Sequence, residues 1–162
     1  MSQTTLDQTA DPASTSKGAR TRQAILAAAI ARFGREGFRA TSVADIARDA
    51  GVGGTVAYTY FGGKEALFLA ALDDDAAAAI QEGVATLLDD PDIAEWRFTL
   101  MATLVRALDR HPLARRVLSG LEPPVTDRVI EIPAMTELRK AVAERVRRDQ
   151  LDGLVRPDID PV

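Results

Sequence analysis

Apolar and polar positions alternate with helical spacing from about residue 20 onward, and short breaks divide this pattern into separate helices. The first stripe predicts a helix from about Arg20 to about Glu36, after which Gly37 can adopt the left-handed conformation that ends a helix. Five apolar side chains form this stripe: Ile25, Leu26, Ala29, Ile30 and Phe33. Residues 1–16 contain few apolar side chains, and we expect them to form a disordered tail.

Two short helices joined by a tight turn are predicted next. Ser42 can cap the earlier helix, and Asp45, three residues later, can reach back to the backbone N–H of Ser42. Gly51 ends this helix, and the following one is predicted from Thr55 to Phe61, closed by two glycines at 62–63. The inward-facing side chains of the earlier helix are Val43, Ile46, Ala47 and Ala50.

The spacing of these two helices predicts a helix-turn-helix. The earlier helix needs small inward side chains so that the later one can cross it closely, and Ala47 and Ala50 meet this need. Gly51 tolerates left-handed geometry in the turn, and Val52 fills the small core beneath it. A helix-turn-helix places its second helix in the major groove of DNA, so DNA binding becomes the leading hypothesis.

The rest of the chain continues the helical pattern. A long helix is predicted from about Lys64 to the acidic, proline-containing stretch 89–92, followed by helices at 93–109, 112–118 and from about 133 to 153. Apolar residues make up 46% of the chain and aromatic residues only 5%, with alanine and leucine prominent, which favours helices over strands. We therefore predict an all-α fold, with a DNA-binding domain at 17–63 and a helical ligand-binding and dimerisation domain at 64–162.

Charge is distributed unevenly along the sequence. The net charge is −4, which by itself argues against binding to nucleic acid. Residues 17–67, however, contain eight basic and four acidic side chains, whereas residues 68–162 contain twelve basic and eighteen acidic ones. A basic N-terminal region on an acidic body suits a protein that neutralises DNA phosphates at one end only. Ordinary scatter of surface charge is the alternative.

The sequence lacks the residues and motifs that several classes of function require. The chain has no cysteine and one histidine, and it contains no glycine-rich phosphate loop that follows a strand, so we expect no enzyme activity, no cofactor and no metal site. Three consecutive aspartates, Asp73 to Asp75, diverge around a helix and are expected to form a solvated face. The N-terminus has no signal-peptide pattern, and no apolar run has the ~20 residues needed to cross a bilayer, which predicts a cytoplasmic protein without a membrane partner.

The stretch from Thr21 to Leu72 resembles the N-terminal domain of the TetR family of transcriptional regulators. The likeness covers about a third of the chain without a gap. Its motifs are Gly37-Phe38, Ala40-Thr41-Ser42-Val43, Asp45-Ile46-Ala47, Ala50-Gly51-Val52, Tyr58-x-Tyr60-Phe61 and Lys64-Glu65-Ala66-Leu67. The resemblance implies a regulator that binds double-stranded DNA at a palindromic operator, more often as a repressor than as an activator.

The resemblance also implies DNA contacts at particular positions. Backbone phosphates would be contacted by Thr41, Ser42, Tyr58, Tyr60 and Lys64, with a purely capping role as the alternative for Thr41 or Ser42. Base edges would be approached by Gly54, Thr55, Val56 and Thr59. Phe61 is expected in the core. For one of the two tyrosines, Tyr60 in particular, burial in the core is the alternative to a phosphate contact.

The sequence departs from the family pattern in this region. Gly53 and Gly54 replace polar residues of the turn, Val56 replaces a hydroxyl residue, and the glycines at 62–63 remove the usual cap of the next helix. We therefore expect fewer direct base hydrogen bonds and a greater contribution of phosphate contacts and DNA shape.

In this family the C-terminal helices bind a small effector and form a homodimer. Six side chains are candidates for an apolar effector site, with simple core packing as the alternative for each: Trp96, Met101, Leu104, Val105, Leu118 and Met135. His111, before Pro112 at a helix end, is expected to act as a cap. Residues 153–162 resemble the loop before two further family helices, so we expect a C-terminally truncated or short member, with homodimerisation depending on those helices. A helical protein-interaction module without DNA binding is the alternative function.

Overall fold

The computed structural model describes residues 12–89, 95–122 and 131–161, and within these ranges all regular structure is α-helical. The helices are α1 (Pro12–Glu36), α2 (Val43–Asp49), α3 (Gly54–Phe61), α4 (Lys64–Asp89), α5 (Trp96–Arg110), α6 (Pro112–Leu118) and α8 (Pro133–Leu151). The all-α prediction is confirmed. Residues 1–11 and 90–94, which include parts of the predicted tail and of the predicted fifth helix, lie outside the described residues.

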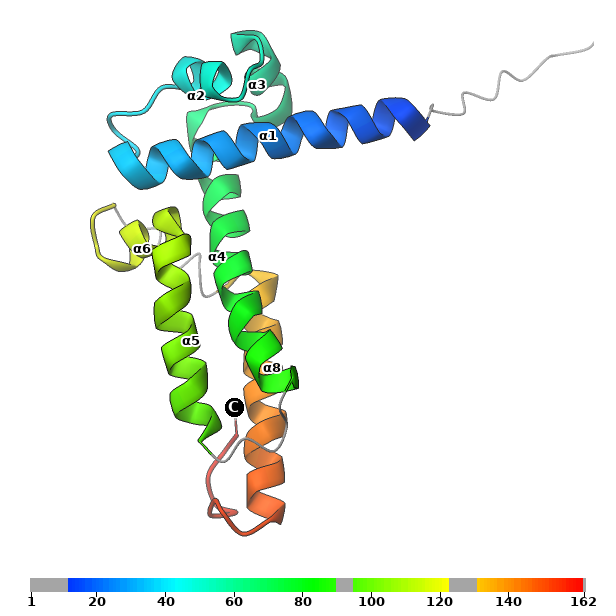
Figure 1. Cartoon of the computed structure of the whole chain (residues 1–162), viewed down its shortest axis with the longest axis vertical. Coiled ribbons are helices and arrows are strands. Elements are labelled where there is room, and N and C mark those ends of the chain that lie inside the picture. The colour runs from blue at the N-terminus through cyan, green and yellow to red at the C-terminus, as the bar shows by residue number, and fades with distance from the viewer. Residues whose placement is uncertain (1–11, 90–94, 123–130, 162) are drawn as a thin grey trace, which may run out of the picture.

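Two parts of the molecule are distinguished in Figure 1. The head consists of α1, α2 and α3, with α1 lying crosswise beneath the other two. The stalk consists of α4, α5, α6 and α8, with α5 and α8 packed along the two sides of α4 and α6 close beneath α1. The helix α1 begins at Pro12, so the tail predicted over 1–16 is wrong for residues 12–16.

One core connects the head with the stalk. The largest fully buried side chains come from α1, α2, α4 and α6, and they are Phe33, Ile25, Leu26, Ile46, Leu67, Leu72, Leu113 and Val117. The helices α1 and α6 approach so closely that a β-carbon at Gly34 would lie 2.8 Å from the Pro112 β-carbon. The head therefore rests on the stalk through packed apolar surface.

Asp75 differs from the solvated carboxylate that the sequence predicted. Its side chain is buried, and one oxygen accepts hydrogen bonds from the backbone N–H groups of Leu113 and Ala114, both at 2.9 Å. The other oxygen lies 2.9 Å from Nδ1 of His111. A carboxylate from α4 thus caps the first turn of α6, where unpaired backbone N–H groups need an acceptor.

His111 lies at the junction that was expected for it. It is the C-terminal cap residue of α5 and directly precedes α6, and its backbone N–H donates to the Ala107 carbonyl at 3.1 Å. Its second ring nitrogen, Nε2, lies 3.2 Å from a Glu82 carboxylate oxygen. The imidazole therefore joins α4 to the α5–α6 corner.

Replacement of Asp75 tests this cap. We expect Asp75→Ala to lower the free energy of unfolding by about 2 kcal/mol, because it leaves two buried N–H donors without an acceptor. Asp74→Ala is the matched control, since Asp74 accepts only a 3.4 Å bond from the exposed Gln23 amide, and it should cost less than about 0.5 kcal/mol. Urea unfolding of both variants measures the difference, and equal losses would contradict the capping role.

Candidate nucleic-acid interface

The helices α2 and α3 form a helix-turn-helix on the outer side of the head. Gly51 adopts φ +68°, and the Val52 N–H donates to the Ala47 carbonyl at 2.9 Å, which closes the turn. Ala57 and Phe61 are the buried residues of α3. Since these two side chains face the head, the opposite surface of α3 is turned to solvent.

That outer surface of α3 contains the residues that were expected to meet DNA. Gly54, Thr55, Val56, Tyr58, Thr59 and Tyr60 are all exposed. Tyr60 is 37% exposed and Tyr58 53%, so neither tyrosine belongs to the core, whereas Phe61 does. The helix contains no charged side chain. Its exposed groups are hydroxyls and one aliphatic side chain, which suit base edges and thymine methyl groups.

Of the two residues at the start of α2 that were expected to contact phosphate, one is exposed and the other is buried. Ser42 is exposed, and its Oγ accepts from the Asp45 N–H at 3.1 Å as an N-terminal cap. The Asp45 carboxylate accepts the Ser42 hydroxyl at 2.6 Å, where the sequence suggested the Ser42 backbone N–H. Thr41, by contrast, is 2% exposed, and its hydroxyl donates to the Gly37 carbonyl at 2.8 Å. Its side chain therefore stabilises the corner after α1 through this local hydrogen bond, and its hydroxyl is not exposed for the expected phosphate contact.

Lys64 lies at the junction between the head and α4. Its ammonium nitrogen is 4.5 Å from the centre of the Phe38 ring and 3.5 Å from the Arg39 carbonyl oxygen. Phe38 in turn packs edge-on against Phe68 at 5.2 Å between ring centroids. These contacts hold the charge of Lys64, which is only half-buried, beside the helix-turn-helix.

An ion pair that the sequence did not suggest fastens α2 to α1. Arg32 donates from Nε and Nη2 to the two carboxylate oxygens of Asp49, at 2.6 Å and 3.1 Å. This bidentate hydrogen bonding lowers the pKa of Asp49, and the Asp49 carboxylate raises the pKa of Arg32. The pKa of Asp45 is also lowered, first by the Ser42 hydroxyl and further by Arg48. Both acids of α2 are thus held as carboxylates by groups of the head.

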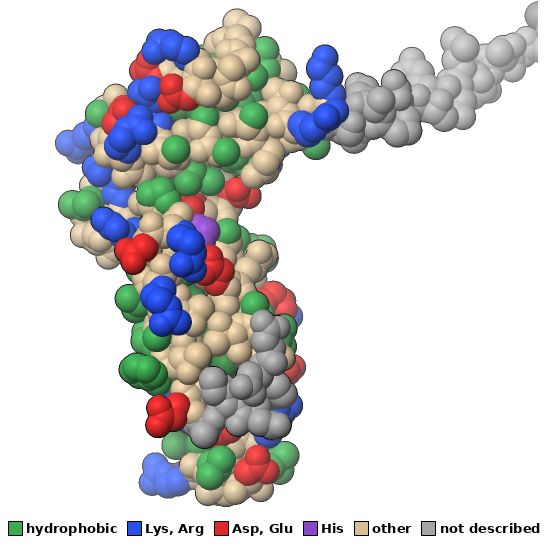
Figure 2. Space-filling model, viewed as in Figure 1, with side chains coloured by type: hydrophobic (Ala, Val, Ile, Leu, Met, Phe, Trp, Pro, Cys, Tyr) green, Lys and Arg blue, Asp and Glu red, His purple; other side chains and the backbone are tan. Residues whose placement is uncertain are grey.

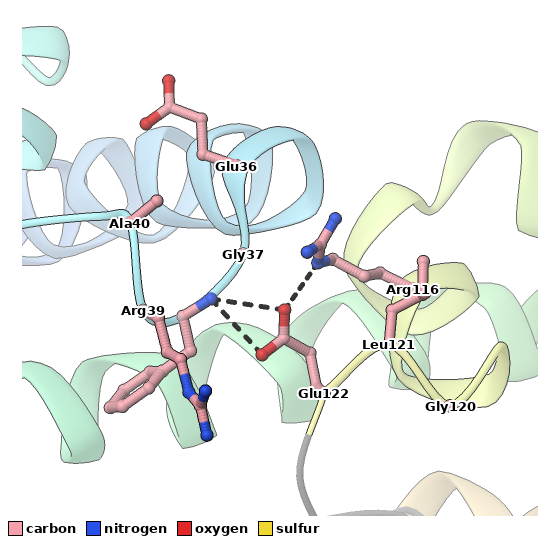
Figure 3. A pocket seen from close by; sticks show the side chains of 9 residues that line it. Glu36, Gly37, Arg39, Ala40, Arg116, Gly120, Leu121 and Glu122 are labelled. Carbon is pink, nitrogen blue, oxygen red and sulfur yellow. Dashed lines mark hydrogen bonds and ion pairs between the residues drawn. The ribbon is translucent and has the colours of Figure 1, made fainter.

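A second polar contact joins the head to the end of α6. Glu122, whose side chain is 4% exposed, accepts from the Phe38 N–H at 3.3 Å and 3.4 Å and from Arg116 Nε at 2.5 Å. Figure 3 shows this carboxylate between the Arg116 guanidinium and the chain that follows α1. Gly37, at φ +85°, leaves the space, because a β-carbon there would lie 2.7 Å from a Glu122 oxygen. The contacts border an open cavity of about 390 Å³.

The stalk contains an apolar cavity of about 240 Å³ between α4, α5, α6 and α8. Five of the six predicted effector residues line it: Met101, Leu104, Val105, Leu118 and Met135. Trp96 does not line it, because its buried indole N–H donates to the Asp149 carboxylate at 2.9 Å elsewhere in the stalk. Sequence periodicity could not separate these cases, because it does not show that the Trp96 indole has a hydrogen-bond acceptor on α8.

Neither a metal centre nor a membrane-spanning helix is found among the described residues. Across the described part of the chain, no group of three histidine or acidic side chains is arranged to hold a metal ion. Among the described helices, none is both long and apolar enough to cross a membrane.

The geometry of the head defines a helix-turn-helix DNA-binding regulator, and comparison with known proteins gives the family. The model of bacterial regulatory proteins of the tetR family matches residues 25–71. No curated protein matches the sequence. Residues 25–71 thus form a DNA-binding domain of the TetR type, and the chain is similar to transcriptional regulators of that family.

Solved structures of similar proteins support this assignment. The TetR transcription regulatory protein of Mycobacterium vanbaalenii is 27% identical, with a TM-score of 0.60 over 91% of this chain and 86% of that one. A TetR family regulator of Marinobacter aquaeolei VT8 is 25% identical, with a TM-score of 0.64 over 91% and 77%. Thermus thermophilus FadR, a TetR family repressor in complex with lauroyl-CoA, shares the fold at 24% identity, with a TM-score of 0.53 over 86% and 73%.

Acid titration tests the Arg32–Asp49 pair. Because its pKa is lowered in the folded protein, Asp49 stabilises the fold above its ordinary pKa and loses this contribution as the pH falls through the folded value. We expect Asp49→Asn to lower the thermal unfolding midpoint at neutral pH, with the difference from the unaltered protein shrinking below about pH 4. Asp109→Asn, which removes an exposed carboxylate in a 3.4 Å pair on the stalk, is the control. A difference that stays constant with pH would count against the pair.

Proposed function

We propose that this regulator is a repressor that binds a palindromic operator as a homodimer and leaves it when a small apolar effector occupies the stalk cavity. One observation supports this proposal above the others: α6 contributes to both functional regions. Ala114 and Leu118 of α6 line the apolar cavity, and Arg116 on the same helix holds Glu122 against the Phe38 N–H of the head. A ligand that displaces α6 therefore changes a direct contact with the head.

The proposed DNA contacts follow from the outer surface of the head. Thr55, Val56 and Thr59 approach base edges from α3, together with the backbone at Gly54. Phosphates are bound by Ser42, Tyr58, Tyr60 and Lys64. In a homodimer two such heads must meet half-sites about one DNA turn apart, so a change in their spacing releases the operator. The division into a DNA-binding domain at 17–63 and an effector domain at 64–162 belongs to the same proposal.

The proposed effector is apolar because the cavity offers it scarcely any polar group. All the residues that line the cavity are alanine, leucine, isoleucine, valine or methionine. Met101, Val105 and Leu118 are also more than half exposed, so they form an open mouth through which a ligand can enter. The complex of the Thermus protein with lauroyl-CoA shows that the same fold accommodates an acyl compound. The proposal includes a cytoplasmic location and no enzyme activity, in agreement with the family in general.

Selection of bound duplexes from a randomised DNA pool tests the function and the roles of two residues. We expect an enriched palindromic sequence. Tyr58→Phe should weaken binding to all duplexes alike by about 1 kcal/mol, because it removes one phosphate hydrogen bond. Val56→Ala should alter the preference at one base pair, because it removes contact with a thymine methyl group. Failure to enrich any sequence would contradict specific operator binding, and a changed preference with Tyr58→Phe would contradict its phosphate role.

Binding of the uncharged dye Nile red tests the cavity. Val105→Trp adds bulk at the exposed mouth and should weaken dye binding at least about tenfold, since the indole competes for the same apolar surface. Arg106→Trp adds the same group to the neighbouring exposed position, outside the cavity lining, and should leave binding unchanged.

Straight-chain fatty acids then test release. An acid that binds the unaltered protein but not Val105→Trp should lower operator affinity only in the unaltered protein. If Val105→Trp and Arg106→Trp bound Nile red equally well, the cavity would not be the ligand site. If a fatty acid bound the unaltered protein without lowering its affinity for the operator, release of DNA by an effector would be contradicted.

A further inference from the structure

The first half of α1 is a basic surface that the helix-turn-helix alone does not account for. From Pro12 to Arg35 the helix contains five basic side chains and no acidic one. The two at its C-terminal end, Arg32 and Arg35, form ion pairs with carboxylates of Glu36 and Asp49. Lys17 and Arg22 are exposed, and no carboxylate in the described ranges forms an ion pair with either of them. The charges of Lys17 and Arg22 are thus not neutralised by an ion pair with any described carboxylate.

This basic surface lies beside the C-terminal end of α3. The guanidinium carbon of Arg22 is 5.2 Å from the centre of the Phe61 ring. One turn earlier on the same face of α1, a β-carbon at Gly18 would lie 3.5 Å from the Tyr60 hydroxyl oxygen. The Tyr60 hydroxyl therefore lies next to α1 at Gly18, the residue that follows Lys17 and lies one turn before Arg22. Figure 2 shows basic side chains at this end of α1, beside the part of the head that α2 and α3 form.

We propose that Lys17 and Arg22 form, together with Tyr60, a second phosphate-binding surface that contacts the DNA backbone beside the groove that α3 enters. The inference rests on the binding of DNA by α3. A phosphate that accepts the Tyr60 hydroxyl lies next to α1, where two cations with no carboxylate partner lower its energy. The long helix α1 thereby extends the footprint of each head beyond the bases that α3 reads. It adds affinity without adding sequence preference, because phosphates are the same at every base pair.

The salt dependence of binding distinguishes a phosphate contact from a structural role. Each neutralised phosphate contributes about 0.9 to the slope of log affinity against log salt concentration. We expect the double variant Lys17→Gln/Arg22→Gln to reduce this slope by about 1.8, so that the affinity loss between 50 and 200 mM salt shrinks by about twelvefold. The preference for the selected operator over a mixed-sequence duplex should stay as it is in the unaltered protein.

Arg106→Gln/Arg139→Gln is the matched control, because it removes two exposed basic side chains from α5 and α8 of the stalk. It lowers the net charge equally and should leave the slope unchanged. The single variant Lys17→Gln is measured as well, since Arg22 also covers the Phe61 ring and its loss can disturb α3. Lys17→Gln should reduce the slope by about 0.9 with an unchanged unfolding midpoint.

Three outcomes would overturn the proposal. In the first, Lys17→Gln and the double variant keep both the affinity and the salt slope of the unaltered protein. In the second, their affinity for DNA falls while the salt slope stays unchanged, and in the third, the control Arg106→Gln/Arg139→Gln lowers the slope by the same amount. The second outcome assigns α1 a purely structural role in holding α3. Absence of any duplex binding by the unaltered protein is a different result, which contradicts DNA binding itself.

Discussion

Burial of one face of α1 is the constraint on which the rest of the structure depends. Ile25, Leu26 and Phe33 are fully buried, and complete burial of such side chains stabilises a fold by about 1.5–3 kcal/mol each. The surface that buries them belongs partly to α2 in the head and partly to α4 and α6 in the stalk. The head consequently has no separate core of its own, and its orientation is set by the helices beneath it.

Polar contacts determine where α6 begins and how the segment after it meets the head. At the first turn of α6 the Asp75 carboxylate of α4 accepts two backbone N–H groups. Beyond its last turn Glu122 joins Arg116 to the Phe38 N–H. Both carboxylates are buried, and a buried carboxylate is tolerated only where donors surround it. A short helix is therefore anchored at both ends while its apolar side borders a cavity, an arrangement that suits a structural link between effector and DNA.

Two groups of basic side chains are distinguished at the head, those that form ion pairs with the acids of α2 and those that lie near α3 without such a pair. Arg32 and Arg48 form ion pairs with Asp49 and Asp45, so their charge is used to hold α2. The surface of α3 has no charge and offers hydroxyl and aliphatic groups, which can distinguish bases. Arg22 of α1 lies against Phe61 at the end of α3, and Lys64 of α4 lies against Phe38 of the head. In the proposed complex, affinity from phosphates and selectivity from bases therefore come from different elements of the head.

Local patterns in the sequence determined the helices and the turn geometry of this protein. Apolar periodicity and the glycines at 37 and 51 predicted α2, α3, α4, α6 and α8 close to their observed bounds, because helix formation and helix ends depend on neighbouring residues. For α1 they predicted the end at Glu36 but not the start at Pro12. The resemblance in the motifs of the head supplied the family, which the comparisons confirm. Five cavity residues were also predicted, because the apolar side chains of each helix can be read from the sequence.

Only the tertiary structure decided the burial and the hydrogen-bond partners of individual polar and aromatic side chains. Thr41 is buried in a corner, Asp75 caps a helix 38 residues away, Trp96 donates to Asp149, and Glu122 meets a backbone N–H 84 residues earlier. The roles of Asp75, Trp96 and Glu122 require a donor or an acceptor that folding brings from a distant part of the chain, and neither periodicity nor a motif records such a partner. The basic beginning of α1 was visible in the sequence, but its place beside Tyr60 follows from the packing of α1 against α3.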